Sequence, residues 1–352
     1  MAAQPLEEHG KLAGSAPVTS GLTTGRVITQ SRYGGPEVLE LARRPRPIPG
    51  PAQVLVRVHA ASVNARDWHV MRGEPRLARL MDRTVFAMRR PRLAVRGTDV
   101  AGVVEAVGAG VTRWKPGDAV FGEGVGTFAE YALASADQLA EVPAGMPLDQ
   151  AAALPLAATT ALLCLDETAL APGGEVLVNG ASGGVGTFAV QLAKAMGLHV
   201  TAVVSTRNTP LVRSLGADEV VDYTVTDFTR TGRAYDAVVD LVGNRRLHEL
   251  RRSVRPGGRL VLSGGGTSGE GHIVGPLRLL LAATAAARFL PFEVVVPQAV
   301  PTTATLERIA GTIGSGHVTP VIDRTFPLEE AAAAVRYVET EHARAKVVIT
   351  VS

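Results

Sequence analysis

The stretch from Glu175 to Lys194 constrains the fold of this chain more than any other. It opens with the apolar run Glu175–Asn179, continues with a turn of small residues, and passes directly into a pattern of helical period. Phe188 and Leu192 repeat at helical spacing, and Gly197 stands where a C-terminal cap is expected. Strand, small-residue turn and helix in this order predict a dinucleotide site. Small residues let the backbone approach a pyrophosphate, and the helix N-terminus offers unpaired N–H groups.

Strand and helix patterns alternate along the segment that follows. Strands are expected at residues 199–204, 220–223, 237–240, 259–263 and 293–296, and helices at residues 211–215 and 246–254. Strands that alternate with helices at short spacing form parallel βαβ units. The sequence therefore predicts an α/β fold with a doubly wound parallel sheet. An α/β domain with an incidental glycine turn is the alternative.

The end of the second strand indicates which dinucleotide binds. An NAD site usually places Asp or Glu there, about 20 residues after the glycines. This chain has Ser205-Thr-Arg-Asn208 instead, without a carboxylate. A hydroxyl and a guanidinium suit a 2′-phosphate, so the sequence predicts NADPH; a solvated loop around Arg207 is the alternative. The residues expected to bind the cofactor here are Ala181, Ser182, Gly183, Gly184, Val185 and Gly186 in the turn, with Ser205, Arg207 and Asn208.

Length and charge narrow the class of protein. With 352 residues, of which 46% are hydrophobic, the chain is long enough to bury two cores. The net charge of +3 is small, and no dense Lys/Arg stripe is interleaved with aromatic residues, so nucleic acid is not an expected partner. The local run of arginines from Arg79 to Arg96 is expected to be a solvated surface segment, with an anionic partner as the alternative.

Cysteine usage and the termini bear on the compartment. Cys164 is the only cysteine, which excludes a disulfide within the chain and a Cys-rich zinc knuckle, and favours a reducing, cytoplasmic location. It lies in an apolar helix-like run and is expected in the core. Residues 1–25 lack the apolar core of a signal peptide. They are expected to be a disordered N-terminal extension, or a misassigned start, outside the fold.

One strongly apolar segment runs from Gly275 to Leu290. Between Arg278 and Arg288 it is far shorter than the roughly 20 residues that cross a bilayer, so no transmembrane segment is expected. A helix buried at a domain or subunit interface is the prediction. A roof over the substrate cleft and a peripheral membrane contact are the alternatives.

The regions on either side of the parallel sheet have β-rich patterns. Strands are expected at residues 54–60, 99–107, 119–121, 318–322 and 346–351, with a helix at 328–339. The last two strands are expected to return to the first region. This predicts a catalytic domain of residues 26–148 and 298–352, into which a dinucleotide domain of residues 149–297 is inserted. The cleft between the two domains is the expected active site.

Several motifs resemble one family, in order, from about Arg26 to the end of the chain. They are Gly34-Gly-Pro-Glu-Val-Leu-Glu-Leu41, Ala61-Ser-Val-Asn64, Gly97-Thr-Asp-Val-Ala-Gly102, Lys115-Pro-Gly-Asp118, Gly180-Ala-Ser-Gly-Gly-Val-Gly186, Gly316-His-Val-Thr-Pro-Val-Ile322 and Ala345-Lys-Val-Val-Ile349. The chain resembles the medium-chain dehydrogenase/reductase superfamily, in its zinc-independent quinone oxidoreductase and enoyl-reductase branch. The resemblance implies a Rossmann NADPH-binding domain inserted in a β-rich GroES-like catalytic domain. It also implies a homodimer, paired through Rossmann edge strands such as 293–296.

The zinc-bearing members of this superfamily hold their catalytic metal with an early Cys, a Gly-His-Glu motif and a later Cys or acid. The corresponding places here read Asn64-Ala-Arg-Asp67 and Gly97-Thr-Asp99, and the four-cysteine structural lobe is absent. Asp99 or His69 alone could bind a metal in principle, but three convergent ligands are not visible. We therefore predict no metal site.

A metal-free site favours a particular reaction. Reduction of an ordinary ketone or aldehyde is harder without a Lewis acid on the carbonyl. Hydride addition to a quinone or another α,β-unsaturated carbonyl places charge on an oxygen that hydrogen-bond donors can stabilise. The leading hypothesis is therefore an NADPH-dependent reductase of such acceptors. A reductase or dehydrogenase of simple aldehydes or alcohols, and a non-catalytic NADPH-binding redox sensor, are the alternatives.

The resemblance also implies site residues. Asn64 matches the asparagine that this branch places beside the nicotinamide and the substrate. His69 falls where many quinone reductases carry a tyrosine. It could donate to the developing oxyanion or relay a proton, or it could be a surface residue beside Trp68. Thr160 matches a threonine near the nicotinamide, with an ordinary buried threonine as the alternative. Lys346 aligns with a family lysine and is also expected at the cofactor.

The ends of the later strands complete the expected cofactor site. The residues there are Val242, Gly243, Ser263 and Gly264, and the two glycines would leave room for the nicotinamide half. Tyr223 ends the third strand and is expected near the adenosine, with an ordinary strand end as the alternative. Asp67 is expected to cap a helix that starts near Trp68.

Overall fold

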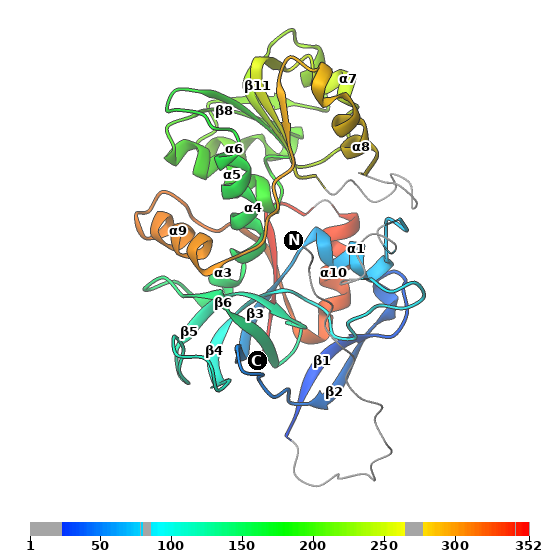
Figure 1. The fold of residues 1–352 in the computed structure, drawn as a ribbon, viewed down its shortest axis with the longest axis vertical. Helices are drawn as coiled ribbons and strands as arrows, with labels where there is room; N and C mark the ends of the chain where they lie inside the picture. The colour runs from blue at the N-terminus through cyan, green and yellow to red at the C-terminus, as the bar shows by residue number, and fades with distance from the viewer. Residues whose placement is uncertain (1–22, 78, 80–85, 265–276, 342, 352) are drawn as a thin grey trace, which may run out of the picture.

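The computed structural model describes residues 23–77, 79, 86–264, 277–341 and 343–351. Figure 1 shows two lobes, one built on a parallel sheet and the other on a largely antiparallel sheet. The parallel sheet is formed by the middle of the chain, and the antiparallel sheet combines the first part of the chain with its C-terminal end. The predicted α/β fold, with a Rossmann sheet beside a β-rich region, is confirmed.

The parallel sheet has the strand order β12-β11-β10-β7-β8-β9, and every neighbouring pair is parallel. Its strands are β7 (Glu175–Asn179), β8 (His199–Val204), β9 (Glu219–Asp222), β10 (Tyr235–Asp240), β11 (Val254–Leu262) and β12 (Glu293–Val295). The chain starts at β7 in the middle, moves out to β9, and then returns to β10 on the other side of β7. Dinucleotides bind such sheets at this reversal.

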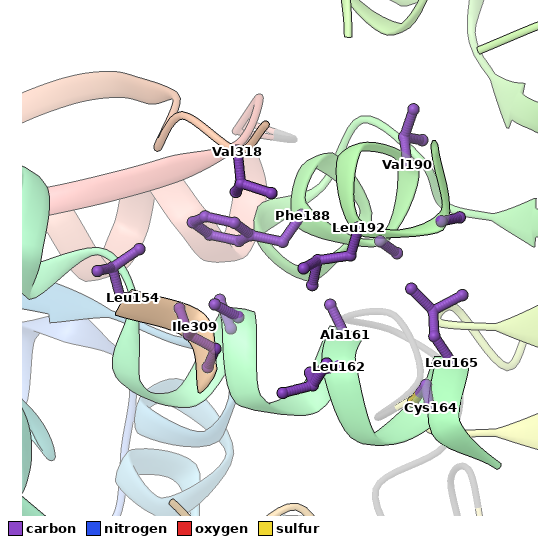
Figure 2. Packing of buried hydrophobic residues seen from close by; sticks show 14 of the residues in the cluster. Leu154, Ala161, Leu162, Cys164, Leu165, Phe188, Val190, Leu192, Ile309 and Val318 are labelled. Carbon is purple, nitrogen blue, oxygen red and sulfur yellow. The ribbon is translucent and has the colours of Figure 1, made fainter. Parts of the chain in front are cut away.

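Helices cover both faces of the parallel sheet. They are α4 (Pro155–Asp166), α5 (Gly184–Ala195), α6 (Thr209–Ser214), α7 (Leu247–Leu250) and α8 (Leu277–Ala286), with short 3₁₀ turns η2 (Thr206–Asn208), η3 (Phe228–Arg230) and η4 (Ala287–Phe289). Figure 2 shows α5 packed on α4, with Phe188 and Leu192 above Ala161 and Leu162, and Val318 beside the Phe188 ring. Cys164 is buried in this cluster, as expected, and burial raises the pKa of its thiol to about 11.

The antiparallel lobe has the strand order β13-β14-β3-β4-β5-β6, and β3 also pairs with β6. Its strands are β3 (Gln53–Val63), β4 (Asp99–Val107), β5 (Ala119–Val125), β6 (Tyr131–Glu141), β13 (Ile322–Pro327) and β14 (Lys346–Thr350), next to the hairpin of β1 (Thr24–Gln30) and β2 (Leu39–Pro45). Its helices and 3₁₀ turns are α1 (Ala65–Arg72), α3 (Leu148–Ala152), α9 (Thr303–Gly314), α10 (Ala331–Thr340), η1 (Pro36–Val38) and η5 (Leu328–Glu330). The C-terminal strand β14 returns to pair antiparallel with β3.

Two predicted elements are wrong. The expected helix at 246–254 is only the single turn α7, because the chain already enters β11 at Val254, which pairs with Tyr235. The expected strand at 318–322 is also wrong, since β13 begins only at Ile322. Pro320 has no N–H to donate to a strand ladder, and Val318 is buried in the core of the other lobe instead.

Two further expectations need a smaller correction. β1 begins at Thr24 and so includes the last two residues of the expected N-terminal extension, and residues 1–22 lie outside the described residues. The apolar segment forms α8 from Leu277, but the helix buries only one face. Leu281 is 60% exposed and Phe289 in η4 is 74% exposed. None of the described helices has the length and apolar character that a membrane crossing requires.

A pair of phenylalanine substitutions tests this assignment of the core. Phe188→Ala should lower the free energy of unfolding by about 3–5 kcal/mol, because it empties a fully buried ring site between α4 and α5. Phe289→Ala makes the same chemical change at an exposed site and should cost less than about 0.5 kcal/mol. Urea denaturation measures both, and equal losses in the two variants would contradict the packing in Figure 2.

Candidate active site

A cavity of about 230 Å³ lies where the carboxyl end of β7 faces the antiparallel lobe. Its walls come from both lobes. They are Val63, Asn64, Ala65, Ala157, Gly180, Gly183, Gly184, Val185, Gly186, Leu241, Val338, Ala343, Ala345 and Lys346. The cavity therefore brings together the glycine turn, Asn64 and Lys346, which the sequence predicts in one site.

The glycines of the turn meet backbone and side chains at close range. A Cβ on Gly186 would lie 2.2 Å from the carbonyl oxygen of Gly180, so only glycine lets α5 start this close to β7. Gly180 itself has φ of +87°, in the left-handed region. Gly183 caps α5 with an extended backbone, which leaves the N-terminus of this helix facing the cavity. The turn thus fits a dinucleotide pyrophosphate.

The predicted adenosine end is a loop held by side-chain hydrogen bonds. The Asn208 Nδ2 donates to Ser182 Oγ at 2.9 Å and to Ser205 Oγ at 3.2 Å, which ties the end of β8 to the glycine turn. Arg207 is exposed on η2, and Tyr223 is 54% exposed just after β9. Ser182, Ser205 and Asn208 therefore lie together, and the roles of Arg207 and Tyr223 at the cofactor stay predictions.

Asp222 reaches the same loop from the end of β9 and is not among the predicted site residues. Thr206 Oγ1 donates to its Oδ2 at 2.5 Å, and Thr224 donates to its Oδ1 through both N–H and hydroxyl. These hydrogen bonds, with the Thr206 hydroxyl first, lower the pKa of the Asp222 carboxyl. The signal was present, because Asp222 lies in the third predicted strand and the carboxyl ends of parallel strands share one edge.

The ends of β10 and β11 meet through backbone contacts. Asp240 Oδ1 accepts hydrogen bonds from the backbone N–H groups of Val242 at 3.1 Å and Gly243 at 3.0 Å. A Cβ on Gly264 would lie 2.5 Å from the carbonyl carbon of Val242, and Ser263 N–H donates to the Asp240 carbonyl. Close packing against the Val242 backbone therefore requires glycine at position 264. Its predicted role beside the nicotinamide stays a prediction.

A buried polar cluster lies on the antiparallel side of the cavity. Asp99 Oδ2 accepts from Ser62 Oγ at 2.7 Å and from Asn64 Nδ2 at 2.9 Å, and its Oδ1 accepts from Leu156 N–H at 3.2 Å. Lys346 Nζ donates to Asn64 Oδ1 at 2.5 Å and lies 3.6 Å from Asp99 Oδ2. We name Ser62, Asn64, Asp99 and Lys346 the amide cluster; all four are buried.

Charged groups around the amide cluster have shifted pKa values. Burial lowers the pKa of Lys346, and the carboxylates of Asp99 and Asp67 oppose this effect. Burial raises the pKa of Asp67 to about 6, although Arg96 and the Asn64 N–H act in the opposite direction. Burial also lowers the pKa of Arg96. Because Asp67, Arg96 and Lys346 are all buried, water screens the electrostatic interactions among them only weakly.

The helix next to the amide cluster starts earlier than predicted. α1 runs from Ala65, with Asn64 as its N-cap residue, and the Asp67 carboxylate accepts from the Asn64 backbone N–H at 2.8 Å. Asp67 is thus the third helical residue of a capping box rather than the cap. This arrangement fixes the backbone at Asn64 while its side chain points to Asp99 and Lys346.

Two other predicted site residues lie apart from the cavity walls given above. His69 is half-buried on α1, and its ring stacks on Trp68 with the ring centroids 3.6 Å apart. Thr160 is buried in α4, where its hydroxyl donates to the Leu156 carbonyl at 2.7 Å. Neither residue is among the lining residues in the described part of the chain. Their roles in catalysis and cofactor binding stay predictions.

Comparison with known proteins gives the family. Residues 50–144 match the family described as alcohol dehydrogenase GroES-like domain, and residues 215–349 match the one described as zinc-binding dehydrogenase. The chain is 32% identical to the chloroplast envelope quinone oxidoreductase homolog of Arabidopsis thaliana, over 90% of this chain and 95% of the relative. It is 34% identical to the chloroplastic NADPH-dependent alkenal/one oxidoreductase of the same plant, over 91% of this chain and 78% of the relative. The solved quinone oxidoreductase from Coxiella burnetii superposes with a TM-score of 0.81 at 28% identity, over 94% of this chain and 100% of that one.

The fold and the glycine turn define a nicotinamide-dependent oxidoreductase, and the relatives are of this class. The chain belongs to the medium-chain dehydrogenase/reductase superfamily, in its quinone oxidoreductase-like branch, and is an NAD(P)H oxidoreductase.

The zinc in the family's description does not fit the residues of this site. Asp99 is the carboxylate of the amide cluster, and the ammonium group of Lys346 lies 3.6 Å from it. Within the described ranges, no three His, Cys, Asp or Glu side chains come together where they could hold a metal ion. An ammonium group and an amide are not ligands that zinc selects in proteins.

Asp99 and Ser62 are the members of the amide cluster that are not among the predicted site residues. Asp99 was weighed only as a lone metal ligand, although it opens the apolar run of β4, where an unpaired carboxylate would be costly. This energetic cost implies that Asp99 has polar partners, and it could have been inferred from the sequence. The partners themselves could not be identified from the sequence, because Lys346 comes from the far end of the chain.

The raised pKa of Asp67 gives a testable pH dependence. The folded state holds the Asp67 proton more tightly than the unfolded state between the ordinary value of 3.8 and about 6. Wild-type stability relative to Asp67→Asn should therefore fall as the pH rises through this window, by up to about 3 kcal/mol. Asparagine keeps the acceptor for the Asn64 N–H and does not titrate. Urea denaturation of both proteins at pH 4 and pH 7 measures the difference, and parallel changes would show that the Asp67 pKa is not raised.

Proposed function

We propose that this protein is a zinc-independent, NADPH-dependent reductase of quinones or other α,β-unsaturated carbonyls. The observation that carries the proposal is that one cavity is lined both by the glycine turn and by Asn64 and Lys346 of the amide cluster. Such a cavity would place a nicotinamide cofactor and a hydrogen-bonding amide against the same acceptor. The names of the quinone and alkenal/one oxidoreductase relatives support this class of acceptor.

The residues of the cavity have separate roles in this proposal. The bound cofactor would supply the hydride. The N-terminus of α5 and the glycine turn would bind its pyrophosphate. Asn64 Nδ2 carries two hydrogens, and Asp99 accepts only one of them, so the second can donate to an acceptor oxygen that gains negative charge. Val63, Val338 and Ala343 supply apolar walls that exclude water.

The choice of NADPH over NADH is part of the proposal. The structure adds Asp222 to the loop at Ser205, and an acid there would favour a ribose 2′-hydroxyl. However, Thr206 and Thr224 already donate to this carboxylate from within the chain. Arg207, which follows Thr206 in the chain, is exposed and is suited to a 2′-phosphate. The NADPH-dependent relative supports the same choice.

The remaining expectations stand as proposals. We propose domain boundaries at residues 26–148, 149–297 and 298–352, a cytoplasmic location, and a homodimer formed through the edge strand β12. Val296, which follows β12, is 50% exposed, and an uncovered apolar edge favours pairing with another copy. Simple aldehydes as substrates, and NADPH sensing without turnover, are the competing functions.

Consumption of NADPH tests the reaction class directly. We expect turnover of a 1,4-quinone and an α,β-unsaturated aldehyde, with the saturated aldehyde slower by at least about tenfold, because an unconjugated carbonyl is harder to reduce without a Lewis acid. EDTA should leave the rates unchanged. Loss of activity with EDTA, or activity only on the saturated aldehyde, would contradict a metal-free mechanism. NADPH binding without turnover would favour the sensor.

A substitution at Arg207 tests the choice of cofactor. Arg207→Ala should raise the KM for NADPH by about tenfold to a hundredfold, since a charge-assisted pair with phosphate contributes about 1.5–3 kcal/mol. The KM for NADH should change less than about twofold. Arg213→Ala removes another exposed arginine, on α6, and is the matched control. Equal effects of Arg207→Ala on both cofactors would place the 2′-phosphate elsewhere.

A further inference from the structure

The carboxamide of Asn64 is held at both of its ends by oppositely charged groups. Its oxygen accepts from the Lys346 ammonium at 2.5 Å, and its nitrogen donates to the Asp99 carboxylate at 2.9 Å. A 180° flip of the amide would turn its nitrogen toward the ammonium and its oxygen toward the carboxylate. Both contacts would then be repulsive, because an ammonium has no acceptor and a carboxylate has no donor. The two charges therefore fix one orientation of the amide.

Neither of the two charged groups can readily move. Asp99 is fully buried and is held by Ser62 Oγ and by the N–H of Leu156 at the start of α4. Lys346 is 2% exposed, and its methylene chain lies against Gly184, where a Cβ would come within 3.1 Å of Lys346 Cδ. The orientation of Asn64 is thus set by groups that are themselves fixed by the packing of both lobes.

The backbone before Lys346 connects this arrangement to the glycine turn. Ala345 N–H donates to the carbonyl oxygen of Ser182 at 2.8 Å, and Ala345 forms a bridge with Gly183. Ala345 has φ of +57°, a strained conformation for a residue other than glycine. A strained residue persists where its surroundings hold it, and here the surroundings are the turn expected to bind the cofactor.

Stability alone gives a weak reason to bury these charges. Replacing a buried ion pair by apolar side chains is often neutral or stabilising. A direct contact of Lys346 with the cofactor would be another reason, but its Nζ is directed to Asn64 and Asp99. What the two charges do provide is a single orientation for an amide that lines the cavity.

We propose that Lys346 and Asp99 are positioning residues that hold the Asn64 carboxamide with its second Nδ2 hydrogen toward the reacting oxygen of the substrate. This inference rests on the proposed function, in which Asn64 donates to that oxygen. Lys346 and Asp99 then affect the rate only through Asn64.

A double-mutant cycle isolates this indirect role. Lys346→Met keeps most of the side-chain volume and removes the charge. It should lower kcat by about tenfold to a hundredfold, because a misplaced donor loses much of its effect in the transition state. Asn64→Ala should lower kcat by at least as much. In the Asn64→Ala background, Lys346→Met should lower kcat less than about twofold further. If the kcat losses of the two single variants multiplied in the double variant, the proposal would be overturned.

Binding and a matched control separate positioning from other roles. The Kd of NADPH should stay within about threefold of wild type in Lys346→Met, whereas weakened NADPH binding with kcat retained would make Lys346 a cofactor ligand and overturn the proposal. Lys194→Met makes the same change at a lysine in the last turn of α5 that is paired with Asp218, and it should leave kcat unchanged. Thermal unfolding verifies that each variant is folded.

A measurement that needs no turnover separates failure of this proposal from failure of the proposed function. With ¹⁵N-labelled asparagine, the Asn64 side-chain signal is the one that Asn64→Ala removes. We expect its hydrogen exchange to be at least about tenfold faster in both Lys346→Met and the second variant, Asp99→Asn, than in wild type. Unchanged exchange in both variants would overturn the positioning role even if the wild type proved inactive. An inactive wild type with the expected exchange would refute only the proposed function.

Discussion

The candidate site depends on the pairing of the C-terminal strand β14 with β3. This pairing sets Val347 opposite Val63, so that Lys346, which precedes Val347, meets Asn64, which follows Val63, although the two are 282 positions apart in the chain. The residue before Lys346 is bonded to the glycine turn of the other lobe. One antiparallel register therefore brings together the amide, its counter-charges and the turn. A slip by one residue would turn Lys346 to the other face of the sheet and remove it from the cavity.

The polar side chains of the amide cluster lie among small and apolar side chains. Ala60, Ala61 and Val63 on β3, with Ala101 on β4, are buried and leave little room for water. Unpaired charges in such surroundings would cost several kcal/mol each, so every member of the amide cluster needs its partner. The cluster and the close apolar packing thus depend on each other, because dry surroundings strengthen the same interactions that make the burial of charge tolerable.

Local patterns predicted the parts of the fold that local interactions form. The strand–turn–helix around Gly180–Gly186 could be predicted, because close backbone contacts between residues a few positions apart require glycine in this turn. The end of the helix expected at 246–254 could not be predicted in this way, because pairing of Val254 with Tyr235 overrides a weak helical pattern. Asn64 and Lys346 were each found through the family resemblance, but their contact and the role of Asp99 follow from the register of β14. No periodicity in the sequence encodes that register.

The amide cluster also explains why the proposed reaction suits conjugated acceptors. A zinc ion polarises a carbonyl by direct coordination, whereas the positive charge here is an ammonium that donates to Asn64 and lies close to Asp99. That charge acts on the substrate only through an oriented N–H group, which is a weaker electrophile than a metal. Such a donor stabilises an oxygen best when the charge on it is delocalised, as after hydride addition to a quinone or an enone. In the proposed mechanism, the lysine that makes zinc binding unfavourable therefore also favours acceptors that do not require zinc.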